Sequence, residues 1–104
     1  MSDFIFVYIT NSSKDEAKKI SRHLLDKKLI ACANIYDGVT SMYHWEGKLA
    51  EETESVLIAK TTMDKFAQVK MEVEKIHTYK VPCIVEIPVS SNEKYFEWIK
   101  KELK

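Results

Sequence analysis

The chain has 104 residues, which suits one domain over residues 1–104 with a modest core and leaves no room for a second. Its 16 basic and 16 acidic side chains cancel, and Arg22 is the single arginine, so neither nucleic acid nor an anionic membrane is an expected partner. The two cysteines, Cys32 and Cys83, form no C-x-x-C motif, and no apolar run is long enough for a signal peptide or a membrane span, which predicts a cytoplasmic protein with reduced thiols.

The first predicted elements are a strand and a helix. Residues 4–9 form a continuous run of β-branched and aromatic side chains, which is typical of a strand covered on both faces. Residues 11–29 follow as a helix that begins with a capping box of Ser13 and Glu16. One apolar stripe at helical spacing comprises Ala17, Ile20, Leu24 and Leu25.

A long hairpin is predicted next. Residues 30–49 alternate as one strand that reaches a turn at Glu46-Gly47, and residues 52–62 return as its partner. Asp37-Gly38 is a second turn signal, but the apolar alternation resumes beyond it, so we expect a bulge or a kink there.

The second half of the chain predicts helix, strand and helix. Residues 62–77 form a helix capped by Thr61 or Thr62, and residues 90–103 form a short final helix with a capping box of Ser90 and Glu93. The apolar side of the first of these helices comprises Met63, Phe66, Val69, Val73 and Ile76.

The last strand is predicted within residues 80–89, and it contains two prolines. Since proline lacks the amide that a central ladder uses, we expect this strand to begin near Pro82 and to lose regular pairing near Pro88. Cys83 then lies inside the strand, close to the helix end that carries His77.

The order β-α-β-β-α-β with an extra C-terminal helix predicts an α+β, ferredoxin-like antiparallel sheet with both main helices on one face. The other face would then be open, although the first strand is apolar on both sides, so we expect a homo-oligomer. The expected interface residues lie on the hairpin: Val39, Met42, Tyr43 and Trp45. Base stacking by the two aromatic residues is the alternative, but their neighbours are acidic, and interfaces favour Trp and Tyr.

Catalytic motifs are not visible, because the loop after the first strand has no arginine to hold phosphate and no nucleophile–histidine set has a suggestive spacing. We therefore expect no enzyme. His77 and Cys83 are candidate ligands for copper or zinc, although one imidazole and one thiol do not close a tetrahedral site. The alternative is that His77 only ends a helix and Cys83 only packs.

Several runs together resemble the CutA family of divalent-cation tolerance proteins, from Phe4 to Ile99. They are "VYIT" with the acidic helix start after it, "KKLIACANI", "GVTSMYHWEGK", "ESVLIAKTT", "IHTYKVPCIVEIPV" and the closing "YFEWI", in this order. The resemblance implies a tight homotrimer of ferredoxin-like subunits whose long hairpins pair with neighbouring subunits. It also implies a non-catalytic role in tolerance to copper and other divalent cations.

The same resemblance supplies the possible copper ligands. The family's run H-P-Y-x-x-P-E reads "HTYKVPC" here, so His77 is retained while Thr78 replaces the proline and Cys83 replaces the glutamate. Some copper-binding members have a cysteine in the first strand, and this chain has Ile9 or Thr10 at that position instead. The alternative function is that of a PII-like trimeric adapter, which binds a small ligand or a protein partner in clefts between subunits.

Overall fold

The computed structural model describes residues 3–104, and residues 1 and 2 of the predicted domain lie outside this range. Its elements in chain order are β1 (Phe4–Asn11), α1 (Lys14–Asp26), β2 (Cys32–Trp45), β3 (Lys48–Thr62), the short 3₁₀ helix η1 (Met63–Lys65), α2 (Phe66–Ile76), β4 (Ile84–Pro88) and α3 (Glu93–Glu102). The predicted order of strands and helices is therefore confirmed.

The strands form one antiparallel sheet in the order β2-β3-β1-β4. β1 is central: it pairs with β3 from Phe4↔Thr62 to Asn11↔Ser55 and with β4 from Ile5↔Pro88 to Ile9↔Ile84. Val89 N–H donates to the Phe4 carbonyl at 3.1 Å, so the adjacent pair Ile5↔Pro88 is one of the alternate pairs that exchange no hydrogen bonds, and the missing amide of Pro88 removes no ladder bond.

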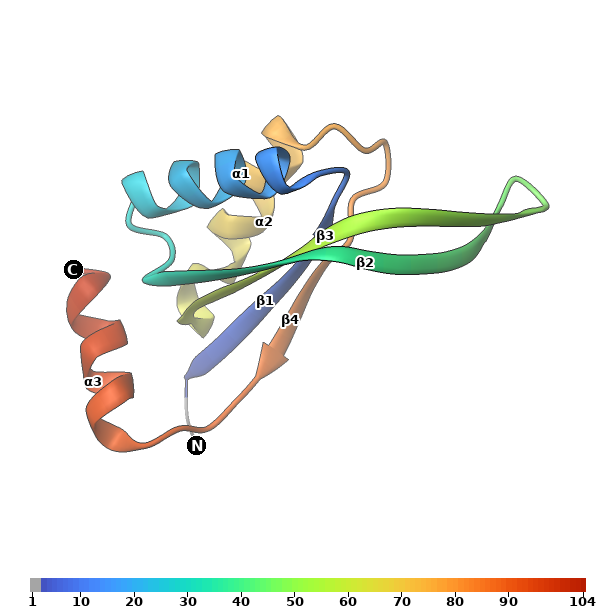
Figure 1. Ribbon diagram of the computed structural model, residues 1–104. Coiled ribbons are helices and arrows are strands. Elements are labelled where there is room, and N and C mark those ends of the chain that lie inside the picture. Colours follow the sequence, from blue (N-terminus) through green and yellow to red (C-terminus); the bar gives the residue numbers. More distant parts are fainter. Residues whose placement is uncertain (1–2) are drawn as a thin grey trace.

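The main core lies on the face that α1 and α2 cover (Figure 1). Alternate β1 residues point into it, since successive side chains of a strand face opposite sides of the sheet. Its fully buried members include Ile5, Val7, Ile9, Ala17, Ile20, Leu24, Leu57, Ala59, Val69 and Val73. The helical periodicity placed Leu25 and Met63 on the apolar sides of their helices, which is wrong, because Leu25 is 39% exposed and Met63 is 41% exposed.

The second face of the sheet is covered at one end, which corrects the expectation of a fully open face. α3 packs there through Ile99, and Leu103 and Phe4 complete a smaller buried cluster. Beyond α3 the same face remains apolar and accessible, because Val85 and Ile87 of β4 are 46% and 40% exposed. Their pairing partners on β1, Tyr8 and Phe6, are half-buried.

β2 and β3 continue together beyond the rest of the sheet as a two-stranded arm of residues 39–54 (Figure 1). β1 pairs with β3 only as far as Ser55, so both outer edges of the arm are unpaired within residues 3–104. The arm lengthens the molecule to 45 Å, against 24 and 22 Å in the other two directions.

The arm begins at the predicted bulge and ends at the predicted turn, and both are confirmed. The register shifts between Tyr36 and Val39, where Gly38 has φ +71° and the Ser55 hydroxyl donates a 2.6 Å hydrogen bond to Asp37. At the tip, Glu46 and Gly47 both have positive φ, as the tight hairpin turns that match strand twist require.

The helix caps were predicted less well. Ser13 caps α1 as expected, with its hydroxyl accepting from Glu16 N–H at 3.1 Å. Thr61, however, donates to the Leu29 carbonyl, and Thr62 precedes η1 without a side-chain cap. α3 begins after Asn92, so the predicted capping box of Ser90 and Glu93 is wrong.

Candidate functional site

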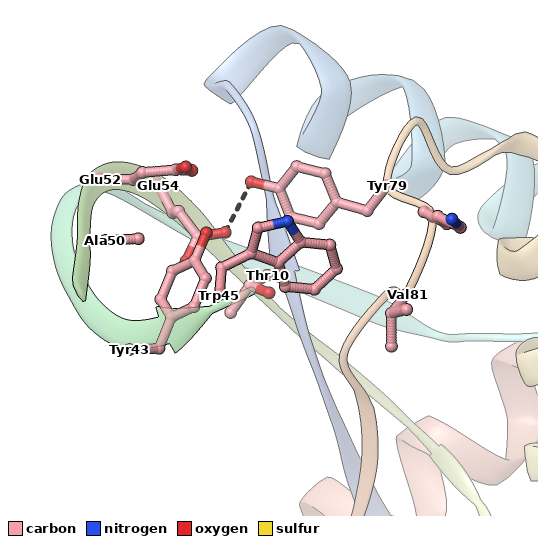
Figure 2. Close-up of a pocket in the computed structure, with 9 residues that line it drawn as sticks. Thr10, Tyr43, Trp45, Ala50, Glu52, Glu54, Tyr79 and Val81 are labelled. Atoms are coloured by element: carbon pink, nitrogen blue, oxygen red, sulfur yellow. Dashed lines mark hydrogen bonds between the residues drawn. The ribbon is translucent and has the colours of Figure 1, made fainter. Parts of the chain in front are cut away.

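A cavity of about 420 Å³ lies where the arm meets the body of the protein (Figure 2). Three parts of the chain form it: the end of β1, the arm, and the segment between α2 and β4. The residues that line it are Thr10, Tyr43, Trp45, Ala50, Glu52, Glu54, Tyr79, Lys80 and Val81. Aromatic rings and carboxylates thus dominate one concave surface, which is typical of a small-ligand site.

Glu54 and Tyr79 form the central polar contact of the cavity. Glu54 is only 6% exposed, and the Tyr79 hydroxyl donates a 2.6 Å hydrogen bond to its Oε2 (Figure 2). Burial and this hydrogen bond raise the pKa of Tyr79 well above its usual value, with a further contribution from the nearby acidic charges. Tyr79 therefore remains a hydrogen-bond donor at physiological pH.

Two of the four predicted interface residues belong to this cavity. Tyr43 and Trp45 lie on one face of the arm, where Tyr43 is opposite Ala50 and Trp45 is opposite Lys48. Burial, together with a hydrogen bond to Glu52, raises the pKa of Tyr43. The other two, Val39 and Met42, do not line the cavity, and Met42 is 60% exposed.

His77 holds Tyr79 in place. The imidazole is fully buried, and its Nε2 lies 2.8 Å from the Thr10 carbonyl oxygen. Its Nδ1 accepts a 3.0 Å hydrogen bond from Tyr79 N–H, which leaves the proton on Nε2. The His77 and Tyr79 rings also pack at 4.8 Å between centroids. Both nitrogens of the predicted metal ligand are thus engaged within the chain.

Glu16 anchors the same segment from the other side. Its carboxylate accepts hydrogen bonds from Thr78 N–H and Oγ1 at 2.9 and 2.6 Å, and from Ser12 N–H and Oγ at 2.8 and 3.0 Å. Burial would raise the pKa of Glu16, but these hydrogen bonds outweigh it and lower the pKa to about 2. Thr78 stands where the family run has proline, which offers neither donor.

Cys83 lies just before β4 rather than inside it, because β4 begins at Ile84, so its predicted place in the strand is wrong. The pairing of β4 with β1 begins at Ile84, two residues after Pro82. It ends at Pro88, so the predicted loss of pairing there is confirmed. Cys83 is a half-buried free thiol.

A complete metal site is not formed by one chain. Within residues 3–104, no three His, Cys, Asp or Glu side chains gather where they could hold an ion. A copper ion at His77 would also displace one of the hydrogen bonds that its ring nitrogens make. The residues of a single subunit therefore do not fit a closed copper centre.

The cavity was missed at the level of sequence, although one signal was present. Glu52 and Glu54 alternate along β3, so they share one face of the arm with the partners of Tyr43 and Trp45. The sequence around Tyr79 and Thr10 does not indicate that these two residues line the cavity opposite the arm, because the cavity joins segments that are far apart in the sequence.

Among the described helices, none combines the length and the apolar character needed to cross a bilayer.

Comparisons with known proteins agree on one family. Residues 5–102 match the family model described as CutA1 divalent ion tolerance protein. The divalent-cation tolerance protein CutA of Archaeoglobus fulgidus is 46% identical over 95 residues, which cover 90% of this chain and 92% of that protein. The protein of the same name from Thermus thermophilus is 38% identical over 96 residues, covering 91% and 93% of the two chains.

Solved structures agree with this result. The structure of the periplasmic divalent cation tolerance protein CutA from Archaeoglobus fulgidus superposes with a TM-score of 0.94 at 41% identity, covering 97% of this chain and 99% of that one. The divalent ion tolerance protein CutA1 of Ehrlichia chaffeensis superposes with a TM-score of 0.93 at 35% identity, covering 100% and 98%. The chain belongs to the CutA1 family of divalent ion tolerance proteins.

Proposed function

We propose that the protein acts as a non-catalytic homotrimer in tolerance to divalent metal ions. The observation that carries the assembly is the arm, whose outer edges are unpaired within residues 3–104 while its apolar side chains are exposed. Trp45 is 48% exposed and Leu49 64% exposed, and the patch of Val85 and Ile87 on β4 adds further apolar surface. Apolar surface of this extent on a small domain supports a partner, and a second copy supplies a matching edge strand.

The geometry of the two surfaces favours a closed ring. The arm projects from one end of the sheet, whereas the free edge of β4 lies on the body, so a contact between them is heterologous. Heterologous contacts give a ring when the rotation closes. The resemblance to the CutA family implies three subunits in this ring, so sedimentation equilibrium at micromolar concentration is expected to give the mass of three chains. A monomer that persists at every concentration would refute the assembly.

The metal role is proposed at the level of binding rather than of a chemical step. His77 and Cys83 would contribute an imidazole and a thiol, which suit copper(I) better than magnesium or calcium, and a neighbouring subunit would complete the coordination. The support is the family to which the chain belongs, whose relatives are named for divalent-cation tolerance. The ring of His77 must exchange one hydrogen bond for the ion.

Copper titration under reducing conditions tests this role. We expect stoichiometric uptake by the wild-type trimer, with His77→Ala and Cys83→Ser each weakening it by about tenfold or more, since each removes one ligand from an already small set. Cys32→Ser is the matched control, because Cys32 is the other half-buried free thiol and lies on β2. Uptake that survives both ligand substitutions would exclude His77 and Cys83 as the site.

The cavity supports a second function, that of a trimeric adapter which binds a small ligand in clefts close to the subunit contacts. Tyr43 and Trp45 belong both to the cavity and to the predicted interface, so binding and assembly share residues. Absence of copper uptake together with an intact trimer would favour this second function over the first.

The cytoplasm remains the proposed location. The two cysteines are both free, as reducing compartments favour. Relatives are named for other compartments, however: the Archaeoglobus fulgidus structure is called periplasmic and the Arabidopsis thaliana protein, 36% identical over 97 residues, is called chloroplastic. Fractionation of the native host, with the protein detected by antibody, decides between these locations.

A further inference from the structure

The cavity between the arm and the body has chemistry that the metal role does not use. We infer that it binds a small organic cation, with an ammonium or guanidinium head held by Glu54 and Glu52 and an alkyl part against Trp45 and Tyr43. This goes beyond the proposed metal function, because it concerns different residues and a different class of ligand. The residues that line the cavity all belong to one chain, and because Tyr43 and Trp45 are also predicted interface residues, assembly is measured beside binding.

The first argument is the charge balance at the cavity. Glu54 is 6% exposed, and within residues 3–104 its carboxylate accepts one hydrogen bond, from the neutral Tyr79 hydroxyl to Oε2. Within residues 3–104, no lysine, arginine or histidine nitrogen lies within 4 Å of the Glu54 or Glu52 carboxylates. Buried carboxylates are normally paired or bonded by charged donors. A cationic head would supply the missing charge.

The contrast with the other buried carboxylates strengthens this argument. Glu16 is satisfied by hydrogen bonds from Ser12 and Thr78, and Glu72 is paired with His23 and Lys75. Glu54 is as buried as these two but has a single neutral donor. It also lines a cavity, which the other two do not.

The second argument is the nature of the walls. Figure 2 shows three aromatic rings among the residues that line the cavity, Tyr43 and Trp45 from the arm and Tyr79 from the segment between α2 and β4. Aromatic faces attract ammonium and guanidinium groups, and the attraction increases when the cation is partly desolvated. A volume of about 420 Å³ is within the range of small-molecule pockets. Both features favour a ligand with carbon atoms as well as a positive charge.

The same features disfavour other ligands. A bare calcium or magnesium ion requires about six or more oxygen ligands, whereas no three carboxylate, histidine or cysteine side chains gather within residues 3–104. An anion would meet Glu52 and Glu54, and the lining carries these two glutamates against one lysine, Lys80, so its formal charge is negative. Organic cations remain as the class that suits both the walls and the charge.

Butylammonium is the probe for this inference, measured with the trimer by calorimetry and by quenching of Trp45 fluorescence. Because the chain has two tryptophans, Trp98→Phe is the background in which quenching reports on Trp45 alone. Saturable binding of butylammonium is expected, with little or no binding of butyrate or butanol. Glu54→Gln should weaken binding by about tenfold or more, since charged hydrogen bonds are worth more than neutral ones.

The matched control is Glu51→Gln, because Glu51 pairs with Met42 on the arm and does not line the cavity. This variant should bind as the parent does. Glu52→Gln, at an exposed position where folding is not in question, should weaken binding by about threefold. The mass of each variant is measured in parallel, so loss of assembly is distinguished from loss of binding.

Three results would overturn the inference: equal binding of butylammonium and butanol, calcium binding that depends on Glu54, or unchanged binding in both Glu54→Gln and Glu52→Gln. A fourth result would also overturn it: the wild-type trimer is intact but binds no amine, and the Glu52→Gln variant dissociates. That last result would mean that a cationic side chain of a neighbouring subunit fills the cavity.

Discussion

Glu16→Gln is expected to remove about 3 kcal/mol of stability at pH 7, because the ionised carboxylate is held by donors from two separate segments. The folded-state pKa of about 2 lies below the ordinary 4.5, so the stabilisation is fully present above pH 4.5 and is lost as the pH falls toward 2. Glutamine keeps an acceptor oxygen but places an amide group among the donors of Ser12 and Thr78. Urea unfolding at pH 7, 4 and 2.5 measures both the loss and its pH dependence.

Two further variants make the interpretation specific. Asp15→Asn also removes a negative charge from the first turn of α1, but Asp15 is exposed, so this variant should keep the acid dependence of the wild type. Thr78→Val removes one donor to Glu16 and should move the acid transition to higher pH. If Glu16→Gln unfolds with the same pH dependence as the wild type, then Glu16 does not carry this stabilisation.

Trp45→Ala is expected to weaken the trimer by about 2 kcal/mol or more, the cost that buried aromatic anchors of interfaces typically show. In a single chain the Trp45 side chain is still 48% exposed, although it lines the cavity, so about half of its surface is available to a partner. The measurement is sedimentation equilibrium over a series of dilutions, in which the variant should dissociate at higher concentration than the wild type.

Trp98→Ala is the control for this second variant. Trp98 is 44% exposed, so it is similar to Trp45 in type and exposure, but it lies on α3 and stacks on Tyr95. Its removal should leave the trimer intact. Equal dissociation of the two variants would show a general loss of stability, and an unchanged trimer in Trp45→Ala would assign Trp45 to the cavity alone.

The fold was predictable because its signals are local. The period of two in the strands and of about 3.6 in α1 and α2 follows from backbone geometry, and the turn at Glu46-Gly47 follows from φ values that few residues adopt. The prediction of a helix cap was wrong where a tertiary contact used the side chain. Thr61, for instance, bonds the Leu29 carbonyl, 32 residues away, instead of a helix end.

The site was predictable only in part, for the same physical reason. His77 was identified as a candidate ligand from its place at a helix end near Cys83, but its partner at Thr10 is 67 residues away in sequence. Glu54 and Tyr79 are 25 residues apart and belong to an arm and a connecting segment that only the folded sheet brings together. Cys83 lies outside β4 because the segment after α2 continues to residue 83. Sequence patterns locate the first residue of a strand only to within a few residues, so this boundary was not predictable.

The unpaired edges of the arm have a consequence for a newly synthesised chain before the proposed trimer forms. A bare strand edge is a template for aggregation, and proteins protect such edges with charges. The β3 side of the arm carries Lys48, Glu51, Glu52 and Glu54. Two arms that met along β3 would bring their glutamates together, and the repulsion would oppose that pairing. β4, with Glu86 as its one charged residue, lacks this repulsion. In the proposed trimer, the charges on the arm would therefore disfavour pairing between like edges without opposing the contact between the arm and β4.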